Sequence, residues 1–304
     1  LNSELNEIKN QYNDERRTEI IQINKSNVEK DIEFVQPEEV VVVMSKNGNI
    51  KKIPAKSFKI QKKSGKGIKN HEELILDAIK TNTIDTLMFF TNMGKVYRLL
   101  VDDVPTGTNA AKGTSIKTLV KFESGEEVLA FTSLNRKTNA QYAIFTTKLG
   151  MIKKTHISEY TSNKRSSIGV QAITLKENDS LSGITFLGEE QVLLLTKKGK
   201  SLRFETNKIT PVGRKGMGVI AMKLDEGDEI VSCIPILNDN DNVAIFSTRG
   251  LGKQVLLKDY PVQGRGGKGT ITYKPTDSSG EVVGGMLINN TDNLLLIGNN
   301  STIA

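Results

Sequence analysis

The stretch VVVVMSKNGNIKK (residues 40–52) decides the fold, because altered copies of it occur four more times along the chain. Each copy is an apolar run, a Ser/Thr-x-x-Gly turn and a short segment containing Lys or Arg. The other copies are LMFFTNMGKVYR (87–98), YAIFTTKLGMIKK (142–154), VLLLTKKGKSLR (192–203) and VAIFSTRGLGK (243–253). The runs are rich in β-forming residues and end at glycine turns, so each copy predicts a β-hairpin.

The glycine spacing predicts a repeat protein. In every copy a second glycine follows the turn glycine 19 residues later, and the pairs are Gly48 and Gly67, Gly94 and Gly113, Gly150 and Gly169, Gly199 and Gly218, Gly250 and Gly269. Successive turn glycines are 46, 56, 49 and 51 residues apart. This spacing leaves room for about four strands per repeat, which is the content of one propeller blade. The glycines serve either a positive φ or the close approach of another backbone.

A sixth apolar run, Leu294–Ile297, precedes Gly298-Asn-Asn-Ser301, and Ser301 lies 51 residues beyond Gly250. We therefore expect an all-β, six-bladed propeller over residues 35–304, with the last blade truncated. Blades bury their apolar faces only against neighbouring blades, so this region should form one body.

Residues 1–34 differ from the repeats. Leu1, Leu5, Ile8 and Tyr12 fall on one helical stripe, and a charged segment follows it. This pattern predicts the end of a helix and a polar linker, with a disordered terminus as the alternative. Because the chain begins at Leu1 rather than Met, we expect it to be a piece of a longer protein.

The composition favours a cytoplasmic protein without its own catalytic, cofactor or metal site. A single cysteine, Cys233, excludes a disulfide within the chain and favours a reducing compartment. No apolar stretch approaches the length of a bilayer span, so no membrane partner is expected. His71 and His156 have no metal-ligand spacing to each other or to Cys233.

Positive charge is concentrated in one part of each repeat. The five 18-residue segments between paired glycines hold 23 Lys and Arg against 5 Asp and Glu, whereas the other 214 residues hold 19 against 30. Equivalent parts of successive blades lie on one rim, so the pattern predicts a basic stripe. A surface that served only solubility would mix both signs.

A continuous positive stripe suits duplex DNA, whose phosphates bind Lys and Arg with a strong salt dependence. The end of each segment is rich in Gly, Ser, Thr and cations, which favours phosphate contact over base recognition. With 5% aromatic residues and no Trp, stacking on single strands is not expected. The candidate DNA-binding residues are Gln61, Lys62, Lys63, Lys66, Lys112, Lys164, Arg165, Arg214, Lys215, Gln263, Arg265 and Lys268.

Two other functions stay open on the residues alone. The same stripe could bind an acidic protein partner, which would make the propeller an interaction scaffold. A propeller hydrolase would need an acid and base set assembled from distant residues, and the sequence shows none.

The loops also resemble a known family. QGRGGKG (263–269) is similar to the basic heptapeptide QRRGGKG of the C-terminal domain of type IIA topoisomerase A subunits, and QKKSGKG (61–67) is a more altered copy. The hairpin segments FFTNMGKVYR (89–98) and IFTTKLGMIKK (144–154) resemble the family's blade openings, and NDERRTEI (13–20) resembles the end of the helix that leaves its cleavage core.

The resemblance implies a six-bladed β-pinwheel, a propeller relative that exchanges strands between blades and wraps DNA on its perimeter. It also implies a parent enzyme with two A subunits and two ATPase B subunits (A2B2), which uses ATP and Mg through other domains, and a cleavage tyrosine upstream of this chain. In gyrases the functional heptapeptide lies on the first blade, where this chain has its more altered copy. Topoisomerase IV has related pinwheels with a degraded or missing heptapeptide, so the resemblance leaves gyrase and topoisomerase IV both open.

Overall fold

A computed structural model describes residues 2–12, 35–58, 68–69, 73–135, 140–160, 169–188, 190–238, 240–289, 294 and 302–303. The chain divides into two compact units, Leu1–Gln36 and Pro37–Ala304, whereas the sequence predicts a boundary after residue 34. In the first unit, α1 (Asn2–Tyr12) is a helix whose residues are all exposed.

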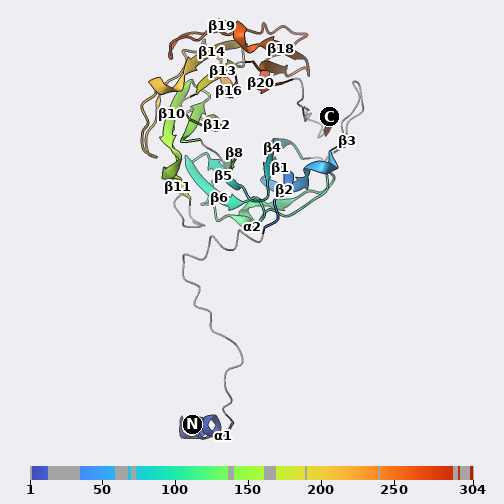
Figure 1. The fold of residues 1–304 in the computed structure, drawn as a ribbon, viewed down its shortest axis with the longest axis vertical. Coiled ribbons are helices and arrows are strands. Elements are labelled where there is room, and N and C mark those ends of the chain that lie inside the picture. The colour runs from blue at the N-terminus through green and yellow to red at the C-terminus, as the bar shows by residue number, and fades with distance from the viewer. Residues whose placement is uncertain are drawn as a thin grey trace. The chain divides into compact units, whose positions relative to one another are not determined.

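The second unit is built from repeats of four strands (Figure 1). The first strand of each repeat is β1 (Glu39–Ser45), β5 (Thr86–Thr91), β9 (Tyr142–Thr147), β13 (Gln191–Thr196) or β17 (Asn242–Ser247). The second is β2 (Asn49–Pro54), β6 (Lys95–Leu100), β10 (Met151–His156), β14 (Lys200–Glu205) or β18 (Gly252–Leu256). Each first strand pairs antiparallel with its second strand, so all five predicted hairpins are confirmed.

Two further strands complete each repeat. The short outer strands are β3 (Ile68–Lys69), β7 (Thr114–Ser115), β11 (Val170–Gln171), β15 (Val219–Ile220) and β19 (Thr270–Ile271). The inner strands are β4 (Ile75–Asn82), β8 (Val128–Leu134), β12 (Leu181–Leu187), β16 (Ile230–Ile236) and β20 (Val282–Ile288). The helix α2 (Ile116–Leu119) is a single turn after β7, and β21 (Thr302–Ile303) is the last strand.

Blades exchange their outer strands. Blade 1 has the order β4-β1-β2-β7, so its outer strand comes from the second repeat, and blades 2, 3 and 4 follow the same rule. These are β8-β5-β6-β11, β12-β9-β10-β15 and β16-β13-β14-β19, and blade 5 has three strands, β18-β17-β20. Successive inner strands contact one another, and the blades follow in chain order around an arc (Figure 1).

The prediction of six blades is wrong: the described residues form five blades. The one strand of the sixth repeat within these ranges is β21, and it pairs with β3 in a two-stranded sheet. Two residues paired with two residues do not make a blade. The predicted sixth strand lies mainly outside the described residues, and Leu294, the part of it that is described, is not in a strand.

The core lies between blades, and this explains the unbroken apolar runs. In β1 the side chains of Val40, Val42 and Met44 pack with Leu87 and Phe89 of blade 2. The residues of alternate parity, such as Val41 and Val43, pack on the opposite face of the same strand. Because both faces are buried, each first strand is apolar throughout instead of alternating. Each such side chain contributes about 1.5–3 kcal/mol when fully buried.

The turn glycines serve both purposes that the sequence left open. Gly199 has φ +82°, and a Cβ there would lie 2.0 Å from the carbonyl oxygen of Tyr273. The oxygen of Gly199 accepts hydrogen bonds from the N–H groups of Thr272 and Tyr273, directly after outer strand β19. The Ser/Thr of the turn contributes as well, since the Thr196 hydroxyl accepts from the N–H of Lys200 at 3.0 Å.

Candidate nucleic-acid interface

In repeats 2, 4 and 5 the loop between the paired glycines crosses from its own blade to the outer edge of the preceding blade. Gly218 directly precedes β15, which pairs with β10 of blade 3, and Gly269 directly precedes β19, which pairs with β14 of blade 4. The loop of residues 211–217 therefore lies against blade 3, and the loop of residues 263–268 lies against blade 4. We call these the repeat-4 loop and the repeat-5 loop.

Hydrogen bonds join the outer edges of neighbouring blades. In the repeat-5 loop, the N–H of Gly266 donates to the carbonyl of Ala221 at 2.7 Å, and the carbonyl of Gly267 accepts from the N–H of Lys223 at 2.9 Å. Ala221 and Lys223 follow the outer strand of blade 3. The repeat-5 loop thus contacts the segment that directly follows β15, the outer strand to which the repeat-4 loop leads.

The repeat-4 loop makes the equivalent contact one blade earlier. The hydroxyl of Thr174 donates to the carbonyl of Lys215 at 2.7 Å, and the N–H of Thr174 donates to the carbonyl of Gly216 at 3.3 Å. Thr174 follows β11, the outer strand of blade 2. The two loops therefore form a connected series along the outer edges of blades 2, 3 and 4.

Half of the candidate DNA-binding residues fall within the described residues. Lys112, Lys215, Arg265 and Lys268 are exposed, and Arg214 and Gln263 are half-buried. Lys112 lies on the edge of blade 1. The other five lie in the repeat-4 and repeat-5 loops, on the neighbouring blades 3 and 4. The other candidates lie outside the described residues; these are Gln61, Lys62, Lys63, Lys66, Lys164 and Arg165.

Three of these cations have partners within the protein. The Lys112 ammonium lies 3.3 Å from a carboxylate oxygen of Glu73, and Nε of Arg214 lies 3.5 Å from Glu159. The guanidinium of Arg265 donates to the carbonyl of Ile220, at the edge of blade 3. The Arg214–Glu159 pair joins two half-exposed side chains, and such pairs are worth about 0–1 kcal/mol, so a phosphate can replace that carboxylate at little cost.

Counting back from the second glycine aligns the loops of different repeats. The fourth residue before that glycine is Lys63, Asn109, Arg165, Arg214 or Arg265. The residue directly before it is Lys66, Lys112, Ile168, Met217 or Lys268. A cation therefore stands at the fourth position in four of the five repeats.

Part of the predicted basic stripe faces inward. Five cations that the charge count placed on the rim are buried in the second hairpin strands: Lys51, Lys52, Lys153, Lys154 and Arg203. Burial lowers the pKa of Lys153 to about 8, and the nearby charge of Glu159 acts in the opposite direction. The sequence holds a signal for their burial, because Lys153 is paired with Phe145 and Lys51 with Val43, both in the apolar first strand.

These buried cations bind backbone carbonyls of the next repeat. Lys52 donates to the carbonyl of Asp102 at 2.6 Å, and Lys154 to that of Thr206 at 3.3 Å. Each acceptor follows the second strand of the next repeat. These cations therefore hold blades together and are not available to a ligand.

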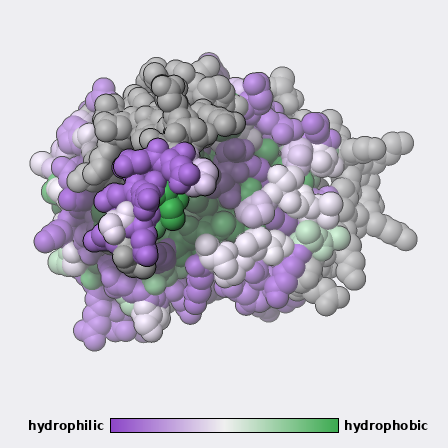
Figure 2. Space-filling view, turned by 90° about the horizontal axis from the view of Figure 1, so that it is seen from below, coloured by the Kyte–Doolittle hydropathy of each residue, from purple (hydrophilic) through white to green (hydrophobic). Residues whose placement is uncertain are grey.

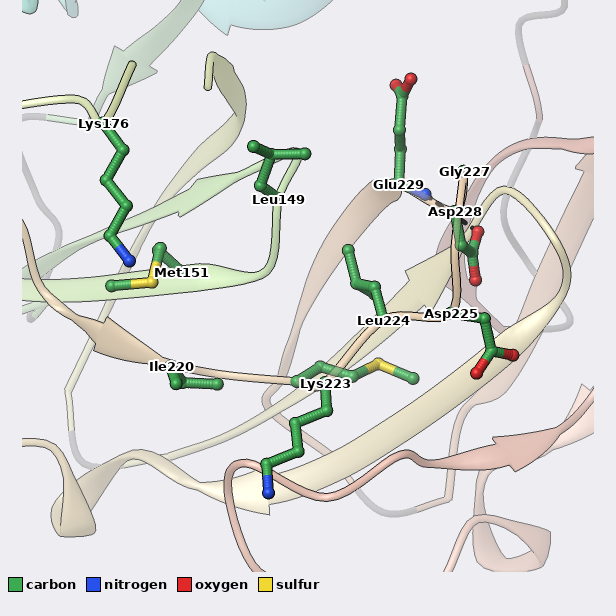
Figure 3. A pocket seen from close by; sticks show the side chains of 11 residues that line it. Leu149, Met151, Lys176, Ile220, Lys223, Leu224, Asp225, Gly227, Asp228 and Glu229 are labelled. Atoms are coloured by element: carbon green, nitrogen blue, oxygen red, sulfur yellow. Dashed lines mark hydrogen bonds between the residues drawn. The ribbon is translucent and has the colours of Figure 1, made fainter. Parts of the chain in front are cut away.

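An open hollow of about 480 Å³ lies beside blade 3 (Figure 3). In this view Lys176 lies on the left and Lys223 at the bottom, with Ile220 between these two lysines, and the acidic turn that contains Asp228 lies on the right. Asp228 accepts hydrogen bonds from the N–H groups of Lys198 and Glu229, both at 2.9 Å, which is the role of a turn-capping carboxylate. The hollow adds two exposed cations that the sequence reasoning missed. Of its acidic residues, Asp228 caps a turn, Asp225 pairs with Lys200 at 2.6 Å and Glu229 with Lys148 at 3.6 Å.

In the view of Figure 2, hydrophilic residues cover most of the coloured surface, and hydrophobic residues show mainly where it is recessed. Among the described residues, no group of three or more His, Cys, Asp and Glu side chains could hold a metal ion. Neither helix in these ranges has the length and apolar character of a bilayer span.

The exchanged outer strands and the cationic loops define a propeller-type domain whose outer edge is suited to binding a polyanion. The family model described as "DNA gyrase C-terminal domain, beta-propeller" matches residues 39–70, 85–135, 141–186, 190–236 and 241–289, one segment for each of the five repeats. The chain belongs to the family of DNA gyrase A C-terminal domains. The resemblance drawn from the heptapeptides is thereby confirmed.

Whole-chain comparisons agree with this assignment. The chain is 35% identical to the DNA gyrase A protein of Helicobacter pylori over 93% of its length and 34% identical to that of Clostridium acetobutylicum over 98%. It spans only 34% and 36% of those relatives, about a third of each.

Two solved structures share the fold. A DNA gyrase A C-terminal domain superposes with a TM-score of 0.77 at 27% identity, over 88% of both chains. The C-terminal domain of a DNA topoisomerase IV gives 0.65 at 25% identity, over 89% of this chain and 84% of the other.

Proposed function

We propose that this domain binds duplex DNA without sequence preference and bends or wraps it along the outer edges of its blades. In this proposal it is the non-catalytic C-terminal domain of the A protein of a cytoplasmic gyrase or topoisomerase IV. The parent enzyme combines two A subunits with two ATPase B subunits and uses ATP and Mg through its other domains. This domain needs no cofactor of its own.

One observation carries the proposal: equivalent cationic loops lie on the outer edges of neighbouring blades, and each is hydrogen-bonded to the segment that follows the outer strand of the blade before. Arg214 and Arg265 occupy the same position in successive loops, and Lys215 and Lys268 are exposed beside them. A duplex that follows the edge meets one pair of cations at blade 3 and another at blade 4. Because its phosphates repeat regularly while its base edges face the grooves, contacts of this kind give affinity with little sequence preference.

The repeat-5 loop allows a matched test. Arg265→Gln with Lys268→Gln removes two charges from the edge. The control, Lys148→Gln with Lys197→Gln, removes one exposed and one half-buried charge from hairpin turns, where they pair with Glu229 and Glu281. Each lost phosphate contact lowers the slope of log affinity against log salt by about 0.9. We expect the loop variant to lose up to about 1.8 of this slope and the control to retain it.

Duplex length and DNA topology test the bending. Affinity should rise as the duplex is extended across several blades, and ligation of nicked circles with the domain bound should shift the linking number. Affinity independent of length, together with an unchanged linking number, would contradict the proposal and favour an acidic protein partner on the same edge.

A further inference from the structure

Two buried lysines occupy the same place in different repeats. Lys51 and Lys153 each stand three residues after the turn glycine, and their exposed fractions are 4% and 0%. Removing an ammonium group from water is costly unless it gains hydrogen bonds, so the partners of these lysines indicate their role.

Both lysines bind the same point of the next repeat's loop. The ammonium of Lys51 donates to the carbonyls of Asn109 at 2.8 Å and Ala111 at 2.7 Å. The ammonium of Lys153 donates to the carbonyl of Arg214 at 2.7 Å and to that of Ala172 at 2.5 Å. Asn109 and Arg214 are both the fourth residue before the second glycine, so the contact is equivalent in the two blades.

Repeat 4 shows that a four-stranded blade forms without a lysine at this position. Its equivalent residue is Leu202, which is fully buried in the same strand position. The repeat-5 loop that crosses over Leu202 is held instead by backbone hydrogen bonds, among them the one from Gly266 to Ala221. A lysine at this position is therefore not required for strand packing, and what it adds is a fixed anchor for the loop.

We propose that Lys153 is a positioning residue for DNA binding, which holds the backbone of Arg214 so that Arg214 and Lys215 face the duplex. Lys51 does the same for the loop that carries Lys112. A loop rich in glycine loses conformational freedom when it binds, and an anchor present in the free protein reduces that loss. This inference rests on the proposed function, since it assumes that the loop cations contact DNA.

The test is a double-mutant cycle on the whole chain. Lys153→Met keeps a long apolar side chain and removes the donors, while Arg214→Gln with Lys215→Gln removes the loop charges. Lys253→Met is the matched control, because Lys253 has the same position in repeat 5 but is exposed, and its ammonium donates to the Thr272 carbonyl at 2.9 Å. Duplex affinity, its salt slope and the melting temperature are measured for each.

We expect Lys153→Met to weaken duplex binding by about tenfold and to lower the salt slope, since the loop cations are no longer held in place. In the loop-neutralised background the same substitution should have no further effect on binding. Lys253→Met should change affinity by less than about twofold.

Three results separate the possible failures. If Lys153→Met lowers only the melting temperature and leaves affinity and slope unchanged, the positioning role is wrong while the proposed function stands. The same holds if its effect on binding persists in full after Arg214 and Lys215 are neutralised. If neutralising Arg214 and Lys215 leaves binding unchanged, the assignment of this loop to DNA binding fails first. Should Lys153→Met not fold, Lys51→Met with neutral Lys112 repeats the cycle in blade 1.

Discussion

Alanine substitutions at three glycines of the loops should separate backbone conformation from close packing. Gly218 has φ +86°, and a Cβ there would lie 2.3 Å from the carbonyl oxygen of Ile152. Gly266 also has a positive φ, +81°, but a Cβ there would meet nothing within 4 Å. Gly264 has neither feature, since its φ is not positive and the space around it is open. The three sites thus carry two, one and none of the expected costs.

The costs can be estimated from the structure. A positive φ costs a residue with a side chain about 1–2 kcal/mol, and overpacking adds about 1–3 kcal/mol. Ile152 is in the middle of blade 3, paired with β9 on one side and with β15 on the other, so it has little freedom to move away. We expect Gly218→Ala to lose about 2–5 kcal/mol, Gly266→Ala about 1–2 kcal/mol and Gly264→Ala less than about 0.5 kcal/mol.

Thermal unfolding followed by circular dichroism measures the series. For a body of this size each kcal/mol shifts the melting temperature by about 2–4 °C, so Gly218→Ala should melt about 4–20 °C below the unsubstituted protein. Equal melting temperatures for Gly218→Ala and Gly264→Ala would refute the argument that outer strands are held by close approach of glycine to the neighbouring strand. A Gly266→Ala variant as unstable as Gly218→Ala would show that backbone conformation alone sets the cost.

Two further predictions concern buried polar groups. Burial lowers the pKa of Lys153 to about 8 from 10.5, so between those pH values the unfolded chain binds more protons and the free energy of unfolding should rise with pH, by up to about 3 kcal/mol. Denaturant titrations at pH 8 and pH 10 should show this rise in the unsubstituted protein but not in Lys153→Met. An equal rise in both proteins would contradict the assignment. The hydroxyl of Tyr97 donates to the buried carboxylate of Glu126 at 2.6 Å. Tyr97→Phe removes this donor and should lower the free energy of unfolding by about 1–3 kcal/mol. In urea unfolding, a loss of stability no larger than that of the exposed Tyr12→Phe would contradict this prediction.

The repeat and its hairpins could be predicted from the sequence because their signals are strong and periodic. An apolar run buried on both faces, such as that of β1, differs clearly from its surroundings, and a Ser/Thr-x-x-Gly turn fixes where the run ends. The exchange of outer strands could be expected only from family resemblance. Outer strands such as β15 have two residues, too few for any hydrophobic period to show.

The blade count failed for a related reason. An apolar run at Leu294–Ile297 predicts a strand, but a blade also needs an inner strand and a second hairpin strand to cover its faces. Among the described residues the sixth repeat provides only Thr302–Ile303, paired with β3. Spacing alone therefore overestimated the number of blades.

The candidate site was predicted in part because lysines in the segments between paired glycines serve two purposes. Lys153 lies in the segment of repeat 3 and Lys215 in that of repeat 4, yet Lys153 is fully buried and Lys215 is exposed. A charge count adds them together, although only an exposed cation adds directly to the field that DNA would meet at the edge under the proposed function. The buried cation acts through geometry, by fixing the backbone that carries the exposed one. The two should therefore differ in experiment: an exposed cation changes the salt slope by its own contact, whereas a buried cation changes it only while the loop cations are present.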